Sequence, residues 1–215
     1  MKIKCLGHAA FVITSDAGLK IITDPYAPSP GLTYGEITES ADIVTVSHGH
    51  TDHGNVAAVR GNPEVVRRTG RSTAKGIEFN GIASYHDDAQ GRLRGNNIIF
   101  CFELDGIKVC HLGDLGHLLD DKQLAEIGSV DIVLIPVGGF FTIDARAASQ
   151  VCDQLKPKVI IPMHYRTEKS FPDIAGVDEF IKGKSNVTRQ DSSEVEFKAG
   201  KLPATSQIIV LKPAL

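Results

Sequence analysis

Three histidines and one aspartate lie within six residues of this chain, at His48, His50, Asp52 and His53. Imidazole nitrogens and carboxylate oxygens are common ligands of divalent metals. The segment follows a hydrophobic run at 42–46 that predicts a strand, and side chains two apart on extended chain point the same way. His48 and His50 can therefore reach one ion. Asp52 and His53 stand at the start of a predicted helical turn and aim at a neighbouring position, so the spacing predicts two adjacent metals.

One short loop cannot complete two coordination spheres, so further ligands are expected at other strand ends. His86 closes a hydrophobic run at 77–85, Asp114 closes a hairpin, and His164 follows a buried strand at 159–162. Such strand-to-loop transitions are where open α/β sheets usually place their chemistry. His111 also precedes Asp114, but it continues the apolar side of its hairpin, which favours a hydrogen-bonded core histidine.

The elements that must position these residues form a pattern that occurs twice. A hairpin pattern at 11–24 ends in Asp24, and a second at 98–114 turns at Asp105-Gly106 and ends in Asp114. Matching strands follow at 41–49 and 130–138, and again at 63–66 and 157–160. The repeat predicts two halves, about 1–90 and 91–215, related by an approximate two-fold, with the strands beginning at Ile43 and Ile132 equivalent and Asp24 and Asp114 at equivalent ends.

Two packed sheets with helices outside would accommodate this pattern, because each half supplies strands separated by helical segments. Helices are predicted around 54–60, 120–127, 144–155 and 176–182. In the second hairpin, alternate residues from 98 to 109 are apolar and predict a buried face, while Cys101 is expected opposite Cys110 on the other face.

Length and composition indicate one globular domain spanning 1–215. The net charge of -3 argues against a nucleic-acid-binding surface. A basic segment (Arg60, Arg67, Arg68, Arg71 and Lys75) is interpreted as a solvated face. The N-terminus has no apolar leader and no run is long enough to cross a membrane, so a cytoplasmic location is expected. The four cysteines lack C-x-x-C spacing and are expected to be reduced core residues.

The order H-x-H-x-D-H, a lone histidine, Gly-Asp and a histidine after a buried strand resembles the metallo-β-lactamase superfamily of binuclear hydrolases. Three phrases, Gly-His-Ala-Ala-Phe at 7–11, Thr-Asp-Pro at 23–25 and His-Leu-Gly-Asp at 111–114, are similar to its compact branch. That branch includes proteins resembling ascorbate-6-phosphate lactonase and phospholipase D-like members. The resemblance covers about three quarters of the chain and implies a four-layer αββα sandwich with metals at one edge, between the halves.

The same resemblance implies a role for each candidate ligand. The first metal would be held by His48, His50 and His86, the second by Asp52, His53 and His164, and Asp114 would bridge them. Asp24 and His8 are expected just outside the ligands, as supports of the metal loop.

Two divalent ions about 3.5 to 4 Å apart can share a water and lower its pKa to near 7. The predicted function is therefore hydrolysis of an ester, lactone or phosphoester by a metal-bridging hydroxide that Asp52 orients. His117 is the candidate proton donor to the leaving group, although a surface histidine at a helix start is an equal alternative. Zinc is the foremost candidate, and manganese, iron and nickel also suit these ligands.

A small anionic substrate is predicted from Arg92 and Arg94, which lie on a loop after His86, although such a loop can be only a turn. Phe140 and Phe141 are candidates for a pocket wall. The alternative functions are a nuclease of the same fold, a diiron redox protein and a non-catalytic metal scaffold. Neither nucleic acid nor membrane is an expected partner.

Overall fold

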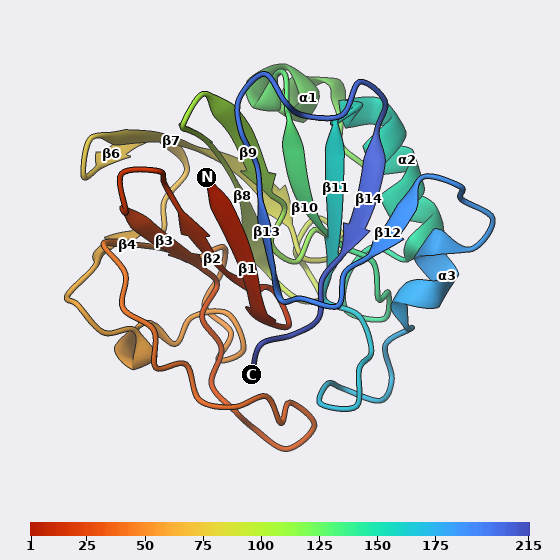
Figure 1. The fold of residues 1–215 in the computed structure, drawn as a ribbon. Coiled ribbons are helices and arrows are strands. Elements are labelled where there is room, and N and C mark those ends of the chain that lie inside the picture. The colour runs from red at the N-terminus through yellow and green to blue at the C-terminus, as the bar shows by residue number, and fades with distance from the viewer.

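The computed structural model describes residues 1–215 and contains two β-sheets packed face to face (Figure 1). The first sheet has the order β13-β1-β2-β3-β4-β5 and comprises β1 (Lys2–Gly7), β2 (Ala10–Thr14), β3 (Lys20–Thr23), β4 (Ile43–Thr45), β5 (Glu64–Val66) and β13 (Glu194–Glu196). The second has the order β12-β14-β11-β10-β9-β8-β7-β6 and comprises β6 (Gly70–Ala74), β7 (Ile77–Tyr85), β8 (Asn96–Leu104), β9 (Ile107–His111), β10 (Ile132–Pro136), β11 (Val159–Met163), β12 (Val187–Arg189) and β14 (Gln207–Val210).

The predicted repeat is present in the strand topology. In the first half the antiparallel pair β2–β3 is followed by β4 parallel to β3 and β5 parallel to β4. In the second half β8–β9, β10 and β11 repeat this arrangement. Ile43 pairs with Ile21 of the first hairpin, and Ile132 pairs with Val109 of the second. The strands that begin at Ile43 and Ile132 are therefore equivalent.

The two acids at the hairpin ends are not quite equivalent, which corrects one detail of the prediction. Thr23 pairs with Phe11 and His111 pairs with Phe100, so Thr23 and His111 are matching positions. Asp24 follows Thr23 directly, whereas Asp114 lies three residues beyond His111. The longer turn carries the second acid further past the strand end.

Apolar side chains from both sheets form the central core. In the second hairpin the predicted buried face is confirmed, since Phe100, Phe102, Leu104, Ile107 and Val109 all lie in this core. Asp105 and Gly106 have φ angles of 53° and 72°, as a two-residue hairpin turn with both central residues left-handed requires. On the opposite face, Cys101 pairs with Cys110 as predicted, and all four cysteines are free.

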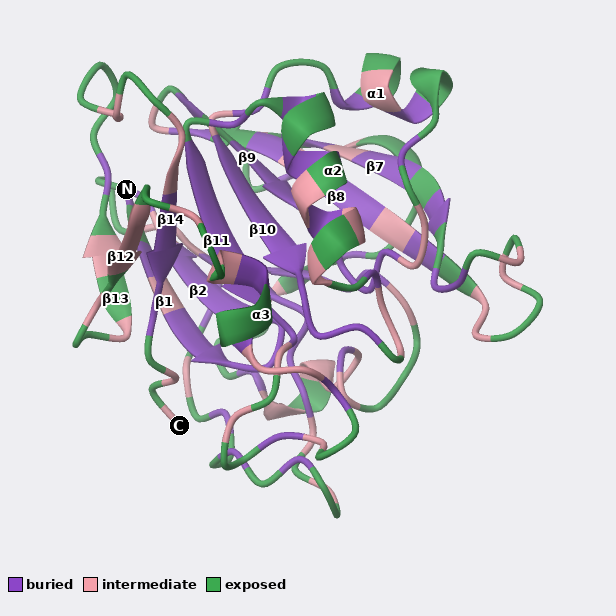
Figure 2. Ribbon diagram, turned by 90° about the vertical axis from the view of Figure 1, so that its right-hand side faces the viewer, coloured by how far each residue is buried: buried purple, intermediate pink, exposed green.

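Three helices cover the outer face of the second sheet: α1 (Asp121–Ile127), α2 (Ala145–Leu155) and α3 (Val177–Ile181). Their positions match the predicted segments. Asp120 caps α1 by accepting from the Gln123 N–H, and Asp144 caps α2 by accepting from the Ala147 N–H. The helices bury one side against the sheet and expose the other (Figure 2). None of them has the length and apolar composition needed to span a membrane.

The outer face of the first sheet is covered mainly by a loop, where the expected four-layer sandwich has a helical layer. Tyr26, Leu32 and Ile37 from this loop pack in one cluster with Val12 and Val44 of the sheet. Prolines at 25, 28 and 30 prevent helix formation there. The predicted helix at 54–60 is reduced to one 3₁₀ turn, η1 (Val56–Ala58). The αββα arrangement is thus present with one outer layer built largely from irregular chain.

Candidate metal centre

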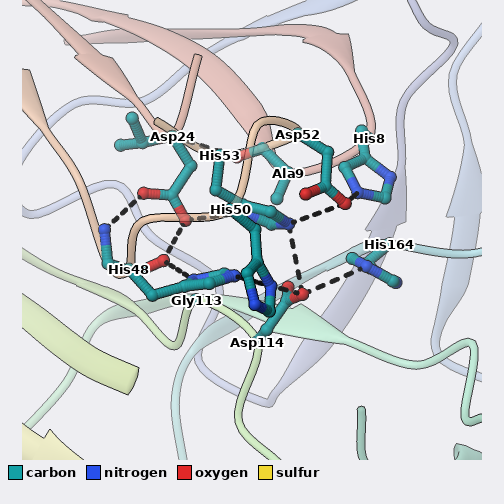
Figure 3. Close-up of polar contacts among 12 residues, drawn as sticks. His8, Ala9, Asp24, His48, His50, Asp52, His53, Gly113, Asp114 and His164 are labelled. Atoms are coloured by element: carbon teal, nitrogen blue, oxygen red, sulfur yellow. Dashed lines mark hydrogen bonds and ion pairs between the residues drawn. The ribbon is translucent and has the colours of Figure 1, made fainter. Parts of the chain in front are cut away.

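Four histidine rings surround the carboxylate of Asp114, which follows β9. Asp114 Oδ2 lies 3.1 Å from Nε2 of both His53 and His86, 3.3 Å from His164 Nε2 and 3.9 Å from His48 Nε2. The Asp114 side chain is 2% exposed. Figure 3 shows this carboxylate below the loop that carries His48 to His53, with His164 approaching from one side.

The remaining ligand candidates form two groups on either side of this carboxylate. The ligand atoms within each group lie within 4.8 Å of one another. One group contains His48, His50 and His86, and the other contains His8, Asp52, His53 and His164. The structure therefore brings together all seven residues proposed from the sequence, from segments more than a hundred residues apart. Apart from Asp114 itself, they fall in the two sets that the resemblance implied, with His8 added to the second; Asp24, His48 and His53 form a third, overlapping set.

Asp24 fixes the metal-binding loop from behind. This residue is fully buried, with its backbone in the left-handed region at φ 38°. Its Oδ1 accepts the Ser47 N–H at 2.8 Å, and its Oδ2 accepts the Ser47 hydroxyl at 2.5 Å and His53 Nδ1–H at 3.0 Å. Because Nδ1 of His53 donates to Asp24, Nε2 is the ring nitrogen that faces Asp114 and the one that would bind a metal.

Hydrogen bonds to Nδ1 also orient the rings of His48 and His86. The Ser47 hydroxyl proton is directed to Asp24, so Ser47 Oγ accepts from His48 Nδ1 at 2.9 Å. His86 Nδ1 donates to the Phe141 carbonyl at 3.0 Å. In both histidines Nε2 is therefore the nitrogen that faces the cluster, where His48 Nε2 lies 3.1 Å from His50 Nδ1 and His86 Nε2 lies 3.1 Å from Asp114 Oδ2.

His111 lies outside the ligand groups, as the core-histidine interpretation predicted. Its ring is fully buried, its Nε2 donates to the Ala9 carbonyl at 3.0 Å, and its Nδ1 accepts the Gly113 N–H at 3.1 Å. Both nitrogens are therefore used to hold the turn that leads to Asp114.

The same turn requires glycine at position 113. Gly113 has φ 55°, and a Cβ there would lie 2.3 Å from Asn97 Oδ1 and 2.6 Å from Ser47 Cβ. Asn97 Oδ1 in turn accepts the Asp114 N–H at 2.9 Å. The turn therefore packs against both the metal loop and the start of β8.

Gly113→Ala is expected to lower the free energy of unfolding by about 1 to 3 kcal/mol because it combines overpacking with left-handed strain. The matched control is Gly18→Ala. Gly18 also has a left-handed backbone, with φ 88°, but an added Cβ would have no atom within 4 Å. Urea denaturation of the metal-free proteins measures both. Equal losses in the two variants would show that the clash contributes nothing.

Charges in this cluster are strongly coupled. Burial opposes ionisation of Asp114, but His164 and His53 hold the pKa of its carboxyl well below the usual range. Burial likewise opposes protonation of His53, and Asp114 and Asp24 overcome this effect and raise its pKa. Burial is the main cause that lowers the pKa of His48 to about 4 and that of His8 to about 3. These two rings are neutral at pH 7, the form that binds metal.

Three buried polar atoms in the cluster have no hydrogen-bond partner: His8 Nδ1, Asp114 Oδ1 and His164 Nδ1. His53 Nε2 and His8 Nε2 each contact a carboxylate oxygen, at 3.1 and 3.3 Å. Leaving such atoms unpaired costs about 1 to 3 kcal/mol each, and ligation relieves this cost. Nitrogen and carboxylate donors in two compact groups around a shared carboxylate fit a pair of divalent ions.

His8 lies closer to the second group than a supporting residue would need to. It follows an irregularity in the β1–β2 pairing, with φ 56°, and its carbonyl accepts the His164 N–H at 3.1 Å. His8 Nε2 lies 3.3 Å from Asp52 Oδ2. The ring is thus held between Asp52 and His164, within reach of any ion that they bind (Figure 3).

A pocket of about 290 Å³ opens above the cluster. Its walls comprise five ligand candidates together with Leu93, Arg94, Phe141 and Phe171. A larger hollow of about 630 Å³ beside α2 and α3 contains none of the ligand candidates. The smaller pocket is therefore where the chemistry can occur.

The structure separates the two arginines that were expected to bind an anion. Arg94 lines the pocket, with its guanidinium 5.8 Å from the centre of the Phe141 ring. Arg92 is exposed, does not line the pocket, and donates from Nε to the Ala89 carbonyl. The structure therefore gives no support to the expectation for Arg92, because its side chain folds back onto its own turn.

His117 does not line the pocket, and the structure gives no support to its expected role as a proton donor. The Tyr85 N–H donates to His117 Nε2 at 3.1 Å, and His117 Nδ1 donates to the Leu118 carbonyl at 2.7 Å. Both nitrogens are occupied by the backbone, leaving no proton directed toward a leaving group. His117 lies shortly before α1, in agreement with the alternative interpretation, a surface histidine at a helix start.

The two phenylalanines expected in a pocket wall differ in position. Phe141 lines the pocket, and its carbonyl holds His86. Phe140 lies outside the wall and contacts Phe141 edge to face, with ring centroids 4.7 Å apart.

Asp87 organises the loop that carries Arg94, and sequence reasoning missed it. Its carboxylate accepts four backbone N–H groups, from Ala89, Gly91, Leu93 and Arg94, at 2.7 to 3.0 Å. Burial opposes its charge, but these donors lower the pKa of Asp87 to about 2. An acid directly before a glycine-rich turn was the available signal.

We expect Asp87→Asn to destabilise the protein at neutral pH, because the amide cannot accept all four N–H groups. The folded pKa lies below the ordinary value, so the extra free energy of unfolding of the wild type is present above about pH 4 and is lost as pH falls toward 2. Unfolding curves recorded from pH 7 to pH 2 measure this. Asp88→Asn, on an exposed neighbouring residue, is the control. If the difference in free energy of unfolding between wild type and Asp87→Asn did not decrease as the pH fell, the role assigned to Asp87 would be contradicted.

Comparison with known proteins agrees with this geometry. Residues 2–164 match the model of the β-lactamase superfamily domain. A relative from Carboxydothermus hydrogenoformans, named UPF0173 metal-dependent hydrolase, is 37% identical over 84% of this chain and 90% of its own. A crystal structure from Thermotoga maritima, named as a candidate Zn-dependent hydrolase of the metallo-β-lactamase superfamily, superposes with TM-score 0.81 at 40% identity, covering 98% of this chain and 97% of the other. An isothiocyanate hydrolase from Delia radicum gut bacteria shares the fold, with TM-score 0.66 and 17% identity over 93% of this chain and all of the other.

Proposed function

Because the chain belongs to the metallo-β-lactamase superfamily, we propose that it is a hydrolase whose two divalent ions are held around Asp114. The observation that carries this proposal is the convergence of six predicted ligand side chains, joined by His8, in two groups around the buried carboxylate of Asp114. Zinc is the foremost candidate because the Thermotoga maritima protein that is 40% identical is named as a candidate Zn-dependent hydrolase, although nitrogen and carboxylate ligands also suit manganese, iron and nickel.

When bound, the ions supply a water of lowered pKa and an electrophile for the carbonyl or phosphoryl oxygen under attack. The protein's own residues orient the attacking water. Asp52 lies in the pocket wall, and although burial opposes its charge, His8 and His53 lower the pKa of its carboxyl. It is therefore ionised at neutral pH and can accept a hydrogen bond from the attacking water.

The substrate that fits this pocket is a small molecule with a negative charge, carrying an ester, lactone or phosphoester bond. A pocket of about 290 Å³ admits a small ligand, and Arg94 is the arginine in its wall. A guanidinium binds carboxylate or phosphate through paired hydrogen bonds. A nuclease is disfavoured because none of the basic residues from Arg60 to Lys75 lines the pocket.

The function is tested by removing metal with a chelator, restoring zinc, manganese or iron separately, and screening lactones, carboxylated esters and phosphoesters. Activity should require metal. Arg94→Ala should then raise KM about 10- to 100-fold with a smaller change in kcat, as expected for loss of a hydrogen bond to a charged group. Arg92→Ala is the matched control and should behave as wild type. Equal effects of the two substitutions would contradict the assignment of Arg94, and metal-independent turnover would contradict the proposed function.

A further inference from the structure

We propose that the substrate is amphipathic: an apolar acyl or aryl group lies against Leu93, Phe140, Phe141 and Phe171 while its negative charge is held by Arg94. The proposal rests on the proposed function and names the substrate class for the same pocket. Three of these apolar side chains line the pocket directly, and Phe140 extends the surface outward from Phe141.

The first observation is where the protein exposes large hydrophobic side chains. The two most exposed are Leu93 at 70% and Phe140 at 62%. Both belong to loops that hold a ligand or line the pocket, since Leu93 is in the wall and Phe140 contacts, edge to face, the residue whose carbonyl accepts from His86. Exposed apolar side chains gathered at one pocket mark a binding surface, whereas scattered ones need no explanation.

The second observation is that the aromatic loop holds Phe140 outward at a conformational cost. Phe140 has φ 60°, a left-handed conformation that is unusual for a bulky residue. Gly138 leaves no room for a side chain, because a Cβ there would lie 2.3 Å from the His164 carbonyl oxygen. The loop is thus packed against one ligand segment and bonded to His86, which keeps the exposed ring in place. Strained residues of this kind concentrate at functional sites.

The third observation is that the charge and the apolar surface are adjacent. Arg94 lies over the ring of Phe141, and Phe141 contacts Phe171 with centroids 5.8 Å apart. Asp87 fixes both Leu93 and Arg94 through their backbone N–H groups, so the apolar and the cationic side chain are presented together. A ligand held at the cluster can therefore contact Arg94 through its anion and the rings through its carbon chain.

The proposal is tested by calorimetry on the full metal-loaded chain with butyrate, hexanoate and octanoate, and with hexanol as the neutral counterpart. We expect affinity to rise about threefold for each added methylene that becomes buried. Hexanol should bind at least about tenfold more weakly than hexanoate because it lacks the charge that Arg94 pairs with.

The double variant Leu93→Ser, Phe140→Ser should flatten the dependence on chain length while keeping butyrate affinity close to wild type. Arg94→Gln should weaken all three carboxylates and keep the slope. Leu118→Ser, which removes a leucine that is 45% exposed and absent from the pocket wall, is the control.

An absent slope in the wild type, or a slope that the double variant retains, would overturn the proposal even if the protein hydrolyses other substrates. Binding of the wild type, but not of the double variant, to phosphatidylcholine vesicles together with a flat carboxylate series would also overturn it, assigning the apolar rim to a lipid surface. Failure of the proposed function appears separately, as hydrolysis that does not depend on metal.

Discussion

Asp114→Ala is expected to lose hydrolytic activity by more than about 100-fold, because losing even an outer partner of a ligand costs about 10- to 100-fold and Asp114 is the proposed ligand shared by both ions. Its Oδ2 lies within 3.3 Å of three imidazole nitrogens that belong to both ligand groups. Removing this carboxylate removes the one residue that both positions share and leaves the surrounding histidines without their counter-charge.

Metal analysis of the purified variant checks the cause. Asp114→Ala should retain less than half of the wild-type metal after dialysis, while Asp88→Ala, on an exposed aspartate, should retain all of it. Full metal content in Asp114→Ala would show that this carboxylate is not shared by the two positions.

Asp24→Ala is the second change with a large expected effect, because it acts on both metal affinity and folding. Three donors lose their acceptor: the Ser47 N–H, the Ser47 hydroxyl and His53 Nδ1–H. Breaking a fully buried ion pair costs about 3 to 5 kcal/mol, and loss of a ligand's outer partner costs about 10- to 100-fold in metal affinity.

Measuring the two effects separately distinguishes them. Urea unfolding of the metal-free protein gives the stability loss, and competition with a chromogenic chelator gives the affinity loss. Asp42→Ala is the control, since this exposed aspartate also accepts a backbone N–H, from Lys20, but lies outside the cluster. Unchanged affinity in a folded Asp24→Ala protein would contradict the role given to this residue.

The parts of the fold that sequence could predict are those governed by periodicity and by turn chemistry. The alternation of apolar residues from 98 to 109 and the Asp105-Gly106 turn specify the second hairpin locally, without reference to the rest of the chain. The ligand candidates could be found because each follows a strand, and strands that end at one edge of a sandwich bring distant residues together. The loop over the first sheet could not be predicted, because its packing through Tyr26 and Leu32 has no periodic signal.

The direction of side chains in loops was the part that sequence could not supply. Arg92 and Arg94 are equivalent on composition alone, but in the structure Arg94 lines the pocket while the Arg92 side chain bonds back to the Ala89 carbonyl. His117 is turned away by the Tyr85 N–H, 32 residues distant in sequence. His8 illustrates the opposite case, since a residue expected to support the ligands lies among them.

The central claim, a two-metal hydrolytic centre around Asp114, is tested most directly by titrating metal into the chelator-stripped protein while bound metal and hydrolytic rate are measured together. The account predicts that the rate rises with bound metal and reaches its maximum at two divalent ions per chain. A stripped, folded protein that hydrolyses substrate at the full rate, or a chain that binds no divalent ion, would contradict it.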